Sequence, residues 1–401
     1  MADGSLADLV PIQSNSTGEL FVQACLEGVP EDAHGFLKDL DQVIESVVAP
    51  SAAAVDEESA HPEAALEALS GIRALGVQIP KAYGGLGYGN EVAALVVERT
   101  ARACASTAAV LMFHYQVVNR TMSFAHPARR ADDLARFADR TLTASAWTES
   151  TGKAKDAPET ALSQAGSSGV IDGVKTFCTG LRSASVIDVL LSADFGGRKG
   201  PTFVRVDTER AGVDIAEIYS MLGLRGTGTG AVELRGVPVR GTDILGPVGS
   251  APELMRRNHR TPLNPGLIAM GIASAAYEDA LRICRGESEG IPARHSRPEV
   301  RRTLAEAAVS VEQTYAYAAH LVRCIAADPE SSHVPASKLK VQATAAAESL
   351  TRRLLPVVGS HGFLSSFPME RHMRDAEATA LMGPTGDLCL SRVAASLLPG
   401  E

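Results

Sequence analysis

The sequence has few aromatic residues and no excess of basic charge. Aromatic side chains make up 4% of the 401 residues, and there is one tryptophan. A core with so few large rings must be built from Ala, Val and Leu, which favours closely packed helices. The formal net charge of -9 at pH 7 provides no basic stripe that would neutralise phosphates. A nucleic-acid partner is therefore not expected.

The cysteines and histidines form no metal or disulfide pattern. The six cysteines lie far apart, with no CxxC pair and no short-spaced Cys/His set. His114, His259, His361 and His372 are scattered singly. We therefore expect neither a disulfide framework nor a metal site.

Targeting signals and long apolar runs are also missing. Residues 1–19 lack both the basic leader and the apolar segment of a signal peptide. The charge-free stretch 261–277 contains two prolines, an asparagine and a serine, so it is too short and too polar to span a bilayer. These absences predict a soluble, cytoplasmic protein that makes no membrane contact.

The pattern of apolar residues divides the chain into three parts, which predicts an α+β protein. Helical spacing dominates up to about residue 140, with clear examples at 64–77 and 91–113. Short β-rich runs punctuated by Gly, Asp, Ser and Pro fill 141–247, as in an antiparallel barrel or sandwich. Helical spacing returns in 248–401, where segments at about 262–285, 298–327, 335–358 and 375–397 predict a four-helix bundle. The expected domains are thus 1–140, 141–247 and 248–401.

Two glycine-rich stretches invite a nucleotide-binding interpretation that their context does not support. GGLGYG at 84–89 follows a helical pattern, and GTGTG at 226–230 runs into a strand. Neither has the strand-turn-helix context of a dinucleotide fingerprint. Tight turns that need positive φ explain both better. GSHG at 359–362 likewise lacks the spacing of a nucleophile elbow.

Four short motifs occur in the order helices, strands, helices. They are SAWTES at 145–150, DGVKTFCTG at 172–180, MLGLRGTGTGAVELRGVPV at 221–239 and VVGSHGFLSSFPMERHMRDAEA at 357–378. Together with the α–β–α order, they resemble the acyl-CoA dehydrogenase superfamily of flavoproteins from about residue 30 to 398. The resemblance implies an N-terminal helical domain, a middle antiparallel β-barrel and a C-terminal four-helix bundle.

The resemblance also implies FAD as the cofactor. Trp147 and Thr148 fall where the family binds the pyrimidine side of the flavin. Phe177 falls where an aromatic ring lies against the isoalloxazine, and Thr179 where a hydroxyl addresses N5. Gly223, Arg225, Gly226 and Thr229 match the segment that ends the β unit.

The fourth motif implies an assembly of subunits. In the family its turn, here Gly359, Ser360 and Gly362 with His361 between them, approaches the adenosine-diphosphate half of FAD bound by a neighbouring subunit. We therefore expect a homodimer or homotetramer.

The sequence departs from the family pattern in two places that bear on the flavin pyrophosphate. TGKAKD at 151–156 replaces the glycine-rich turn after the first motif, and CRGESEGIPARH at 284–295 replaces the Arg/Phe-Gly segment after the first bundle helix. Arg285 is the nearest candidate for a pyrophosphate partner. A solvated charge at a helix end explains this arginine equally well.

The usual catalytic base is missing. Dehydrogenation of an acyl thioester needs a carboxylate to take the α proton while hydride leaves for the flavin. The register after the RDA triplet sets Gly383 at the position of the family's usual glutamate, and the alternative position on the first bundle helix falls on Thr261.

Three interpretations of this absence remain open. Another carboxylate serves as base, with Asp387 and Glu253 the nearest candidates. Alternatively, the chemistry needs no such base, because reduced flavin reacts with oxygen to hydroxylate a substrate or because a β-keto acid loses carbon dioxide before flavin oxidises it. We favour this second interpretation. The third is a non-catalytic flavoprotein or interaction scaffold.

A basic cluster lies before the charge-poor stretch, at the expected mouth of the acyl channel. Arg256, Arg257 and Arg260, with His259 among them, are candidates to bind a substrate carboxylate, a phosphopantetheine phosphate or an acidic carrier protein. We also expect Thr261 and Gly383 to face the substrate, because they occupy the two positions of the family's catalytic base. His259 is the one member with a pKa naturally near neutrality, and a basic helix end or subunit contact is the alternative interpretation of the cluster.

The sequence thus predicts a homo-oligomeric FAD oxidoreductase acting on an acyl-CoA or an acyl carrier protein substrate. Its electron acceptor is either an electron-transfer flavoprotein or molecular oxygen. Ordinary dehydrogenation with a relocated base is the alternative.

Overall fold

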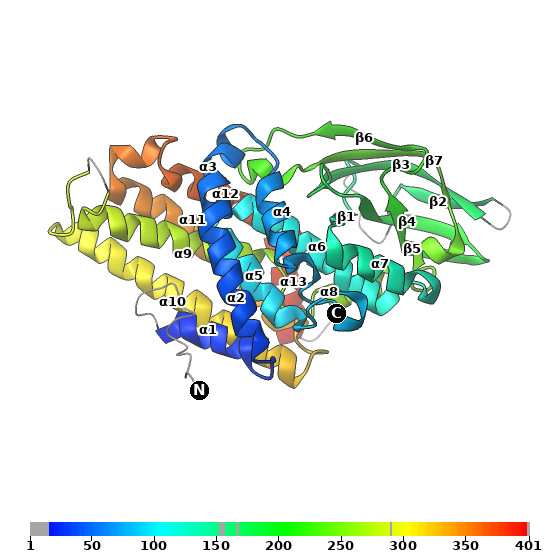
Figure 1. Ribbon diagram of the computed structural model, residues 1–401, viewed down its shortest axis with the longest axis horizontal. Coiled ribbons are helices and arrows are strands. Elements are labelled where there is room, and N and C mark those ends of the chain that lie inside the picture. The colour runs from blue at the N-terminus through cyan, green and yellow to red at the C-terminus, as the bar shows by residue number, and fades with distance from the viewer. Residues whose placement is uncertain (1–15, 152–156, 166–167, 289–290, 399–401) are drawn as a thin grey trace.

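The N-terminal part of the molecule is entirely helical. The computed structural model describes residues 16–151, 157–165, 168–288 and 291–398 (Figure 1). The N-terminal helices are α1 (Ser16–Leu26), α2 (Asp32–Val43), α3 (Ala49–Glu57), α4 (Glu63–Gly71), α5 (Gly89–Ala103), α6 (Ala105–Phe124) and α7 (Pro127–Asp139). The helix expected at 64–77 ends at Gly71, and a short 3-10 turn over Ala74–Gly76 follows.

The middle part is one eight-stranded sheet. Its strands are β1 (Thr143–Ala146), β2 (Ala161–Ala165), β3 (Ser168–Cys178), β4 (Val186–Phe195), β5 (Arg198–Asp207), β6 (Val213–Ile218), β7 (Gly230–Val239) and β8 (Ile244–Leu245). Along the sheet the order is β6-β7-β3-β2-β4-β5-β8, with β1 paired to β4. Most strand pairs are antiparallel, as expected, but β1 and β2 both run parallel to β4, so the sheet is mixed.

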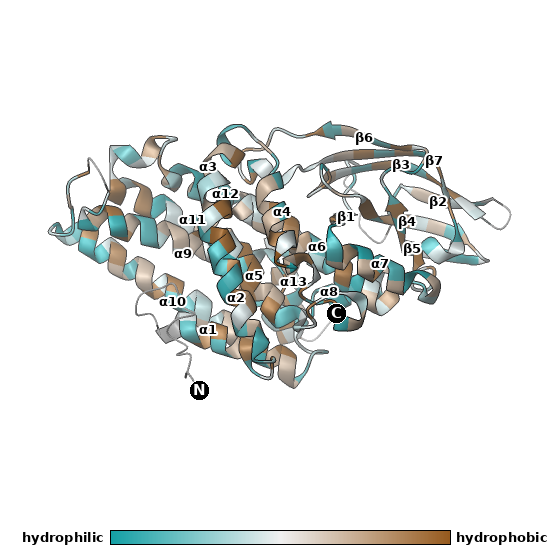
Figure 2. Cartoon of the chain, in the orientation of Figure 1, coloured by the Kyte–Doolittle hydropathy of each residue, from teal (hydrophilic) through white to brown (hydrophobic). Residues whose placement is uncertain are grey.

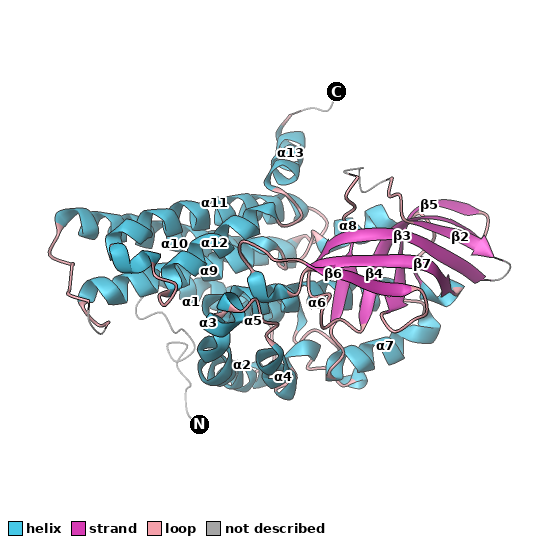
Figure 3. Cartoon of the chain, turned by 90° about the horizontal axis from the view of Figure 1, so that it is seen from above, coloured by secondary structure: helices cyan, strands magenta, loops and turns pink. Residues whose placement is uncertain are grey.

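The C-terminal part is helical again. Its elements are α8 (Ala251–Asn258), α9 (Pro265–Arg285), α10 (Pro298–Ala327), α11 (His333–Val358), α12 (Pro368–Leu381) and α13 (Gly386–Leu397). The single helix expected at 375–397 is two helices that meet at residues 382–385, because Pro384 lacks the N–H that a continuous helix needs there. Figure 3 shows α13 projecting away from α9 to α12.

Small residues let the helices of the core approach closely. Residues 92–101 of α5 are all buried, and Figure 2 shows hydrophobic residues concentrated where α5 lies. A Cβ on Gly271 of α9 would lie 2.7 Å from the Cβ of Ala101. The low content of aromatic side chains is thus accompanied by close contact between the backbones of α5 and α9. Among the described residues, no helix is long and apolar enough to cross a membrane.

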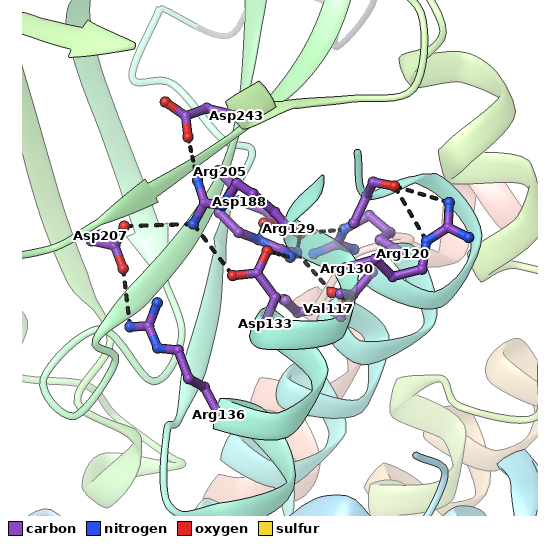
Figure 4. A network of polar contacts seen from close by, with 12 residues as sticks. Val117, Arg120, Arg129, Arg130, Asp133, Arg136, Asp188, Arg205, Asp207 and Asp243 are labelled. Atoms are coloured by element: carbon purple, nitrogen blue, oxygen red, sulfur yellow. Dashed lines mark hydrogen bonds and ion pairs between the residues drawn. The ribbon is translucent and has the colours of Figure 1, made fainter. Parts of the chain in front are cut away.

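A buried ionic network joins the N-terminal helices to the sheet (Figure 4). Arg205 of β5 donates to Asp188 of β4 at 2.9 Å and to Asp133 of α7 at 3.0 Å, and all three side chains are at most 3% exposed. Arg120 of α6 also donates to Asp188, at 3.0 Å. The network fixes α6 and α7 against β4 and β5. Strand β4 pairs with β1, on which the first motif begins.

Candidate functional site

The first two motifs meet on neighbouring segments of the β unit. Thr148 and Thr176 form an isolated antiparallel bridge, in which the Thr176 N–H donates to the Thr148 carbonyl at 2.9 Å. Trp147 packs on Phe203 with ring centroids 5.2 Å apart. The structure therefore places Thr148 of the first motif beside Thr176, the residue before Phe177.

Phe177 has an unusual conformation for a strand residue. Its φ is +53°, the ladder of β3 is irregular between Lys175 and Cys178, and the side chain is 59% exposed. A left-handed backbone is costly for a bulky residue, and such strain gathers at functional sites. The ring packs against Tyr219 at 5.0 Å. Sequence reasoning missed Tyr219, which carried no motif.

The second and third motifs form a row of hydroxyl groups beside Phe177. Thr229 Oγ1 donates to Thr179 Oγ1 at 3.4 Å and lies 2.8 Å from Thr227 Oγ1. The Gly180 N–H donates to the Thr227 carbonyl at 3.1 Å. The glycine-rich GTGTG stretch thus serves as a tight turn, with φ of +59° at Gly228, that brings Thr229 to Thr179.

A buried ion pair holds the first motif in place. Lys175 Nζ donates to Glu149 Oε1 at 2.6 Å, and the backbone N–H groups of Glu159 and Thr160 donate to the same carboxylate at 2.7 and 2.9 Å. Although burial opposes ionisation, these donors, led by Lys175, lower the pKa of Glu149 to about 2. The motif therefore remains anchored as an ionised pair at neutral pH.

The third and fourth motifs form a tight joint between the β unit and the bundle. The carboxylate of Asp375 accepts the Leu224 N–H at 2.6 Å, and Arg374 donates to Asp56 of α3 at 2.5 Å. A Cβ on Gly223 would lie 2.1 Å from the Arg374 carbonyl oxygen. Since glycine at 223 is required for this approach, the RDA triplet fixes the relative position of three parts of the chain.

The remaining positions matched to the third motif are also anchored at this joint. Arg225 Nε donates to Ser59 Oγ at 3.2 Å, and the Gly226 N–H donates to Ser106 Oγ at 3.2 Å. Arg225 and Gly226 therefore hold the segment against the N-terminal helices.

The turn at 359–362 lies at the end of α11. Gly359 has φ of +82°, Ser360 is exposed and Gly362 is buried. A Cβ on Gly359 would lie 2.1 Å from a guanidinium nitrogen of Arg294. Arg294, which sequence reasoning missed, is thus the cation beside this turn.

Arg285 lies at the exposed end of α9. Its guanidinium is 54% exposed and 4.0 Å from Glu287. Residues 152–156 of the replaced glycine-rich segment lie outside the described residues, so no protein partner for a pyrophosphate is identified from that side.

The candidate bases are poorly placed for proton abstraction. Gly383 and Asp387 are exposed, and Asp387 lies in the first turn of α13. Glu253 accepts hydrogen bonds from Arg256 at 2.6 Å and Arg257 at 3.4 Å. The Arg256 guanidinium is the main cause of a lowered pKa at Glu253, and a carboxylate stabilised in this way is a weak base.

The basic cluster is divided rather than aligned. Helix α8 ends at Asn258, so the helical spacing expected to place Arg256 and Arg260 on one face does not extend to Arg260. Arg256 is 63% exposed and bound to Glu253, whereas Arg257 and Arg260 line a cavity of about 280 Å³. Arg256 and Arg257 point in different directions because they are consecutive residues of one helix, and Arg260 lies beyond the end of that helix.

The cavity contains three of the predicted substrate positions, Arg257, Arg260 and Thr261. Thr261 lines it and donates from Oγ1 to the Asn258 carbonyl at 2.9 Å. His259 follows the last residue of α8 and is half-buried, but it is not among the cavity-lining residues. Arg120, which sequence reasoning did not single out, lines the cavity and reaches within 5.6 Å of the Trp147 ring centroid. Arg120 therefore contacts Trp147 of the first motif and also lines the cavity.

The residues present fit the ring end of the FAD that the resemblance implies. An exposed, strained aromatic ring and a row of hydroxyl groups lie where β3 ends and β7 begins. Thr176 Oγ1 is buried without a hydrogen-bond partner among the described residues. A flat apolar ring system with a hydrogen-bonding edge suits this surface.

Comparisons with known proteins agree with the motifs. The family model for the acyl-CoA dehydrogenase N-terminal domain matches residues 30–169, and that for the C-terminal domain matches residues 260–398. Cyclohex-1-ene-1-carbonyl-CoA dehydrogenase from Geobacter metallireducens is 28% identical over 347 residues, which cover 85% of this chain and 91% of that relative.

Solved structures share the fold over nearly the whole chain. The dibenzothiophene monooxygenase TdsC from Paenibacillus sp. A11-2 aligns with a TM-score of 0.79 and 22% identity, covering 90% of this chain and 97% of TdsC. The prolyl acyl carrier protein oxidase AnaB aligns with a TM-score of 0.81 and 18% identity, covering 90% of this chain and 98% of AnaB.

Proposed function

The chain belongs to the acyl-CoA dehydrogenase superfamily and is an FAD-dependent oxidoreductase; from this premise we propose that its reaction is not ordinary α,β-dehydrogenation. The proposed chemistry is flavin-dependent oxygenation or the oxidation of a carbanion left by decarboxylation. The proposed substrate is an acyl-CoA or an acyl group on a carrier protein.

The placement of the carboxylates carries this proposal. Neither family position for the base holds an acid, since Gly383 is exposed and Thr261 lines the cavity. Among the described residues that line the cavity, Glu330 is the acidic one, and it is ion-paired with Arg260 at 2.5 Å. The α proton of an acyl thioester would therefore meet no poised carboxylate.

Two relatives support this direction by their names. One structural neighbour is a monooxygenase and another is an acyl carrier protein oxidase. Both reactions occur on the fold of this chain. In the proposed reaction FAD supplies the redox chemistry, while Phe177 and Thr179 hold its ring and the cavity residues hold the substrate.

The proposal is tested by separating reduction of the flavin from its reoxidation. The purified flavoprotein is mixed anaerobically with butyryl-CoA, and flavin absorbance is followed. Separately, photoreduced enzyme is exposed to air, and the rate of reoxidation is measured. We expect no reduction by butyryl-CoA and fast reoxidation by oxygen.

The opposite result identifies the alternative. Rapid reduction by butyryl-CoA that is lost in Asp387→Asn or Glu253→Gln would establish ordinary dehydrogenation with a relocated base. The conservative variants keep the size of each side chain and remove only its charge.

We also propose that the enzyme is a homodimer or homotetramer. Phe363 and Leu364, within and just after the turn at 359–362, are 73% and 49% exposed. Exposed large apolar side chains beside a turn of this kind support a subunit contact there.

A further inference from the structure

The cavity of about 280 Å³ contains an unusual set of unpaired donors. It lies between the start of α5, the end of α6, helix α8 with the residues just after it, and the loop that joins α10 to α11. Arg120 Nη1, Asn258 Nδ2 and Arg260 Nε are buried and have no hydrogen-bond partner among the described residues. All three groups donate and none accepts. Because buried donors are nearly always paired in folded proteins, three on one cavity indicate a ligand rich in acceptors.

Arg120 is rigidly held with one edge directed away from its protein partners. Its side chain is 1% exposed. Nε donates to Asp188 at 3.0 Å, and Nη2 donates to Ser145 Oγ. The guanidinium also lies 5.2 Å from the Phe203 ring centroid and 5.6 Å from that of Trp147. These contacts fix the plane of the guanidinium and leave Nη1 for a ligand.

The charge around Arg120 favours an anion. The ionic network that contains it joins five arginines to four aspartates, Arg120, Arg129, Arg136, Arg205 and Arg210 with Asp133, Asp188, Asp207 and Asp243. One positive charge is therefore left without an opposite charge within this network. Arg120 shares the carboxylate of Asp188 with Arg205, so an anion beside Nη1 would be stabilised by positive charge that Asp188 does not fully compensate.

The cavity adds two more cations near its surface. Arg260 pairs with Glu330, whose side chain is 76% exposed, and Arg257 stacks on Phe124 at 5.1 Å while it also contacts Glu253. The cavity therefore has a buried cation on α6 and partly neutralised cations near its surface.

We propose that this cavity binds the carboxylate of a small acidic acyl group, with Arg120 Nη1, Asn258 Nδ2 and Arg260 Nε as its donors. The inference rests on the proposed function, since it makes the enzyme's substrate a dicarboxylic or similarly acidic acyl compound. Scaled from the ~150 Å³ cavity that binds benzene, the volume accommodates roughly ten non-hydrogen atoms. A glutaryl group, with about eight non-hydrogen atoms, fits within this volume.

The burial of the donors favours the carboxylate of a substrate over the phosphate of a phosphopantetheine carrier as their ligand. Arg120 and Asn258 are at most 4% exposed. A phosphopantetheine phosphate remains near the surface, where Arg256 and Arg257 are 63% and 55% exposed. The buried donors therefore suit the far end of the substrate.

Calorimetric titration of the holoenzyme tests the assignment. The probes are glutarate, its uncharged diamide glutaramide, and inorganic phosphate. We expect glutarate to bind and glutaramide to bind at least tenfold more weakly. Arg120→Lys keeps a cation beside Asp188 but loses the fork, and Asn258→Asp replaces a donor by a negative charge. Each variant should weaken glutarate binding at least tenfold.

Arg302→Gln is the control, because this arginine is exposed on α10 and lies outside the cavity lining. It should leave glutarate affinity unchanged. If Arg120→Lys fails to fold, the isosteric Asn258→Asp variant still decides. Equal affinity for glutarate and glutaramide, or unchanged binding in Asn258→Asp, would overturn the proposal. Binding of phosphate without glutarate would show a phosphate site instead.

Flavin content, measured in the same samples, separates this proposal from the proposed function. A colourless protein that binds glutarate through Asn258 would support the anion site and contradict the proposed redox function. A flavoprotein that reoxidises rapidly in air but does not distinguish glutarate from glutaramide would contradict the anion site and leave the proposed function standing.

Discussion

At the scale of single residues, Phe177 combines backbone strain with exposure of a large apolar ring. Its φ of +53° and the 59% exposure of its apolar side chain both reduce the stability of the protein when nothing else covers the ring. A flavin that covers the ring would offset both costs. We therefore expect a change at Phe177 to affect apoprotein stability and flavin binding in opposite directions, which is not expected of a purely structural aromatic residue.

Phe177→Gly should stabilise the flavin-free protein by about 1 kcal/mol, because glycine adopts positive φ without penalty. The same change should weaken flavin binding about tenfold, because the stacked ring is lost. Thermal unfolding of apoprotein and titration with FAD measure the two effects. Val174→Ala, on the same strand and also exposed, is the control and should change neither. A loss of apoprotein stability in Phe177→Gly would show that the ring is needed for packing on Tyr219.

Thr179 offers a second residue-scale prediction. Removal of its hydroxyl in Thr179→Ala should weaken flavin binding or shift the visible absorption of the flavin, since one hydrogen bond contributes about 1 kcal/mol. Thr179→Ser keeps the hydroxyl and should behave as the unmodified protein. Identical spectra and affinities in all three proteins would place the flavin elsewhere.

At the scale of elements, the joint between α12 and the segment before β7 is sensitive to pH. Burial raises the pKa of Asp375 from 3.8 to about 6, against the effect of the Leu224 N–H. The folded state therefore holds this proton more tightly than the unfolded state. The resulting contribution to stability is fully present below about pH 4 and is lost as the pH rises through about 6.

Asp375→Asn should remove this pH dependence while it keeps an acceptor for the Leu224 N–H. We expect the variant to match the unmodified protein near pH 4 and to exceed its stability at pH 7 by up to about 3 kcal/mol. Chemical denaturation at several pH values provides the comparison. Parallel stability curves for the two proteins would show that Asp375 has an ordinary pKa.

The ionic network makes a second element-scale prediction. Arg205→Met should destabilise the protein by about 3–5 kcal/mol, because the buried carboxylates of Asp188 and Asp133 each lose a charged hydrogen-bond donor. Arg136 pairs with Asp207 but is 43% exposed, so Arg136→Met should cost less than about 1 kcal/mol. Urea unfolding of both variants distinguishes the roles. Equal losses would mean that the buried and outer pairs are energetically alike.

At the scale of the whole molecule, the proposed assembly depends on the turn at 359–362. Phe363→Glu places a charge on an exposed apolar residue and should dissociate a subunit contact formed there. Analytical ultracentrifugation should show a dimer or tetramer for the unmodified protein and smaller species for the variant. An unmodified protein that sediments as a monomer would contradict the assembly.

The sequence by itself determined the order of helices and strands and the motifs that we expect to face the flavin. Both are local properties. Periodicity reports which face of a segment is buried, and TES and FCTG keep their residues close together along the chain. The absence of an acid at Gly383 and Thr261 was likewise visible from register alone, and the structure introduces no free carboxylate among the described residues lining the cavity.

The tertiary structure alone decided which residues form the cavity and how the strands pair. Arg120 and Asp188 are 68 positions apart, and nothing in the helical pattern around Arg120 marks a buried cation. The parallel pairing of β1 and β2 with β4 and the separation of Arg256 from Arg260 at the end of α8 also depend on long-range packing. A buried charge is tolerated only where distant partners meet it, and those partners are assembled by the fold rather than by neighbours in sequence.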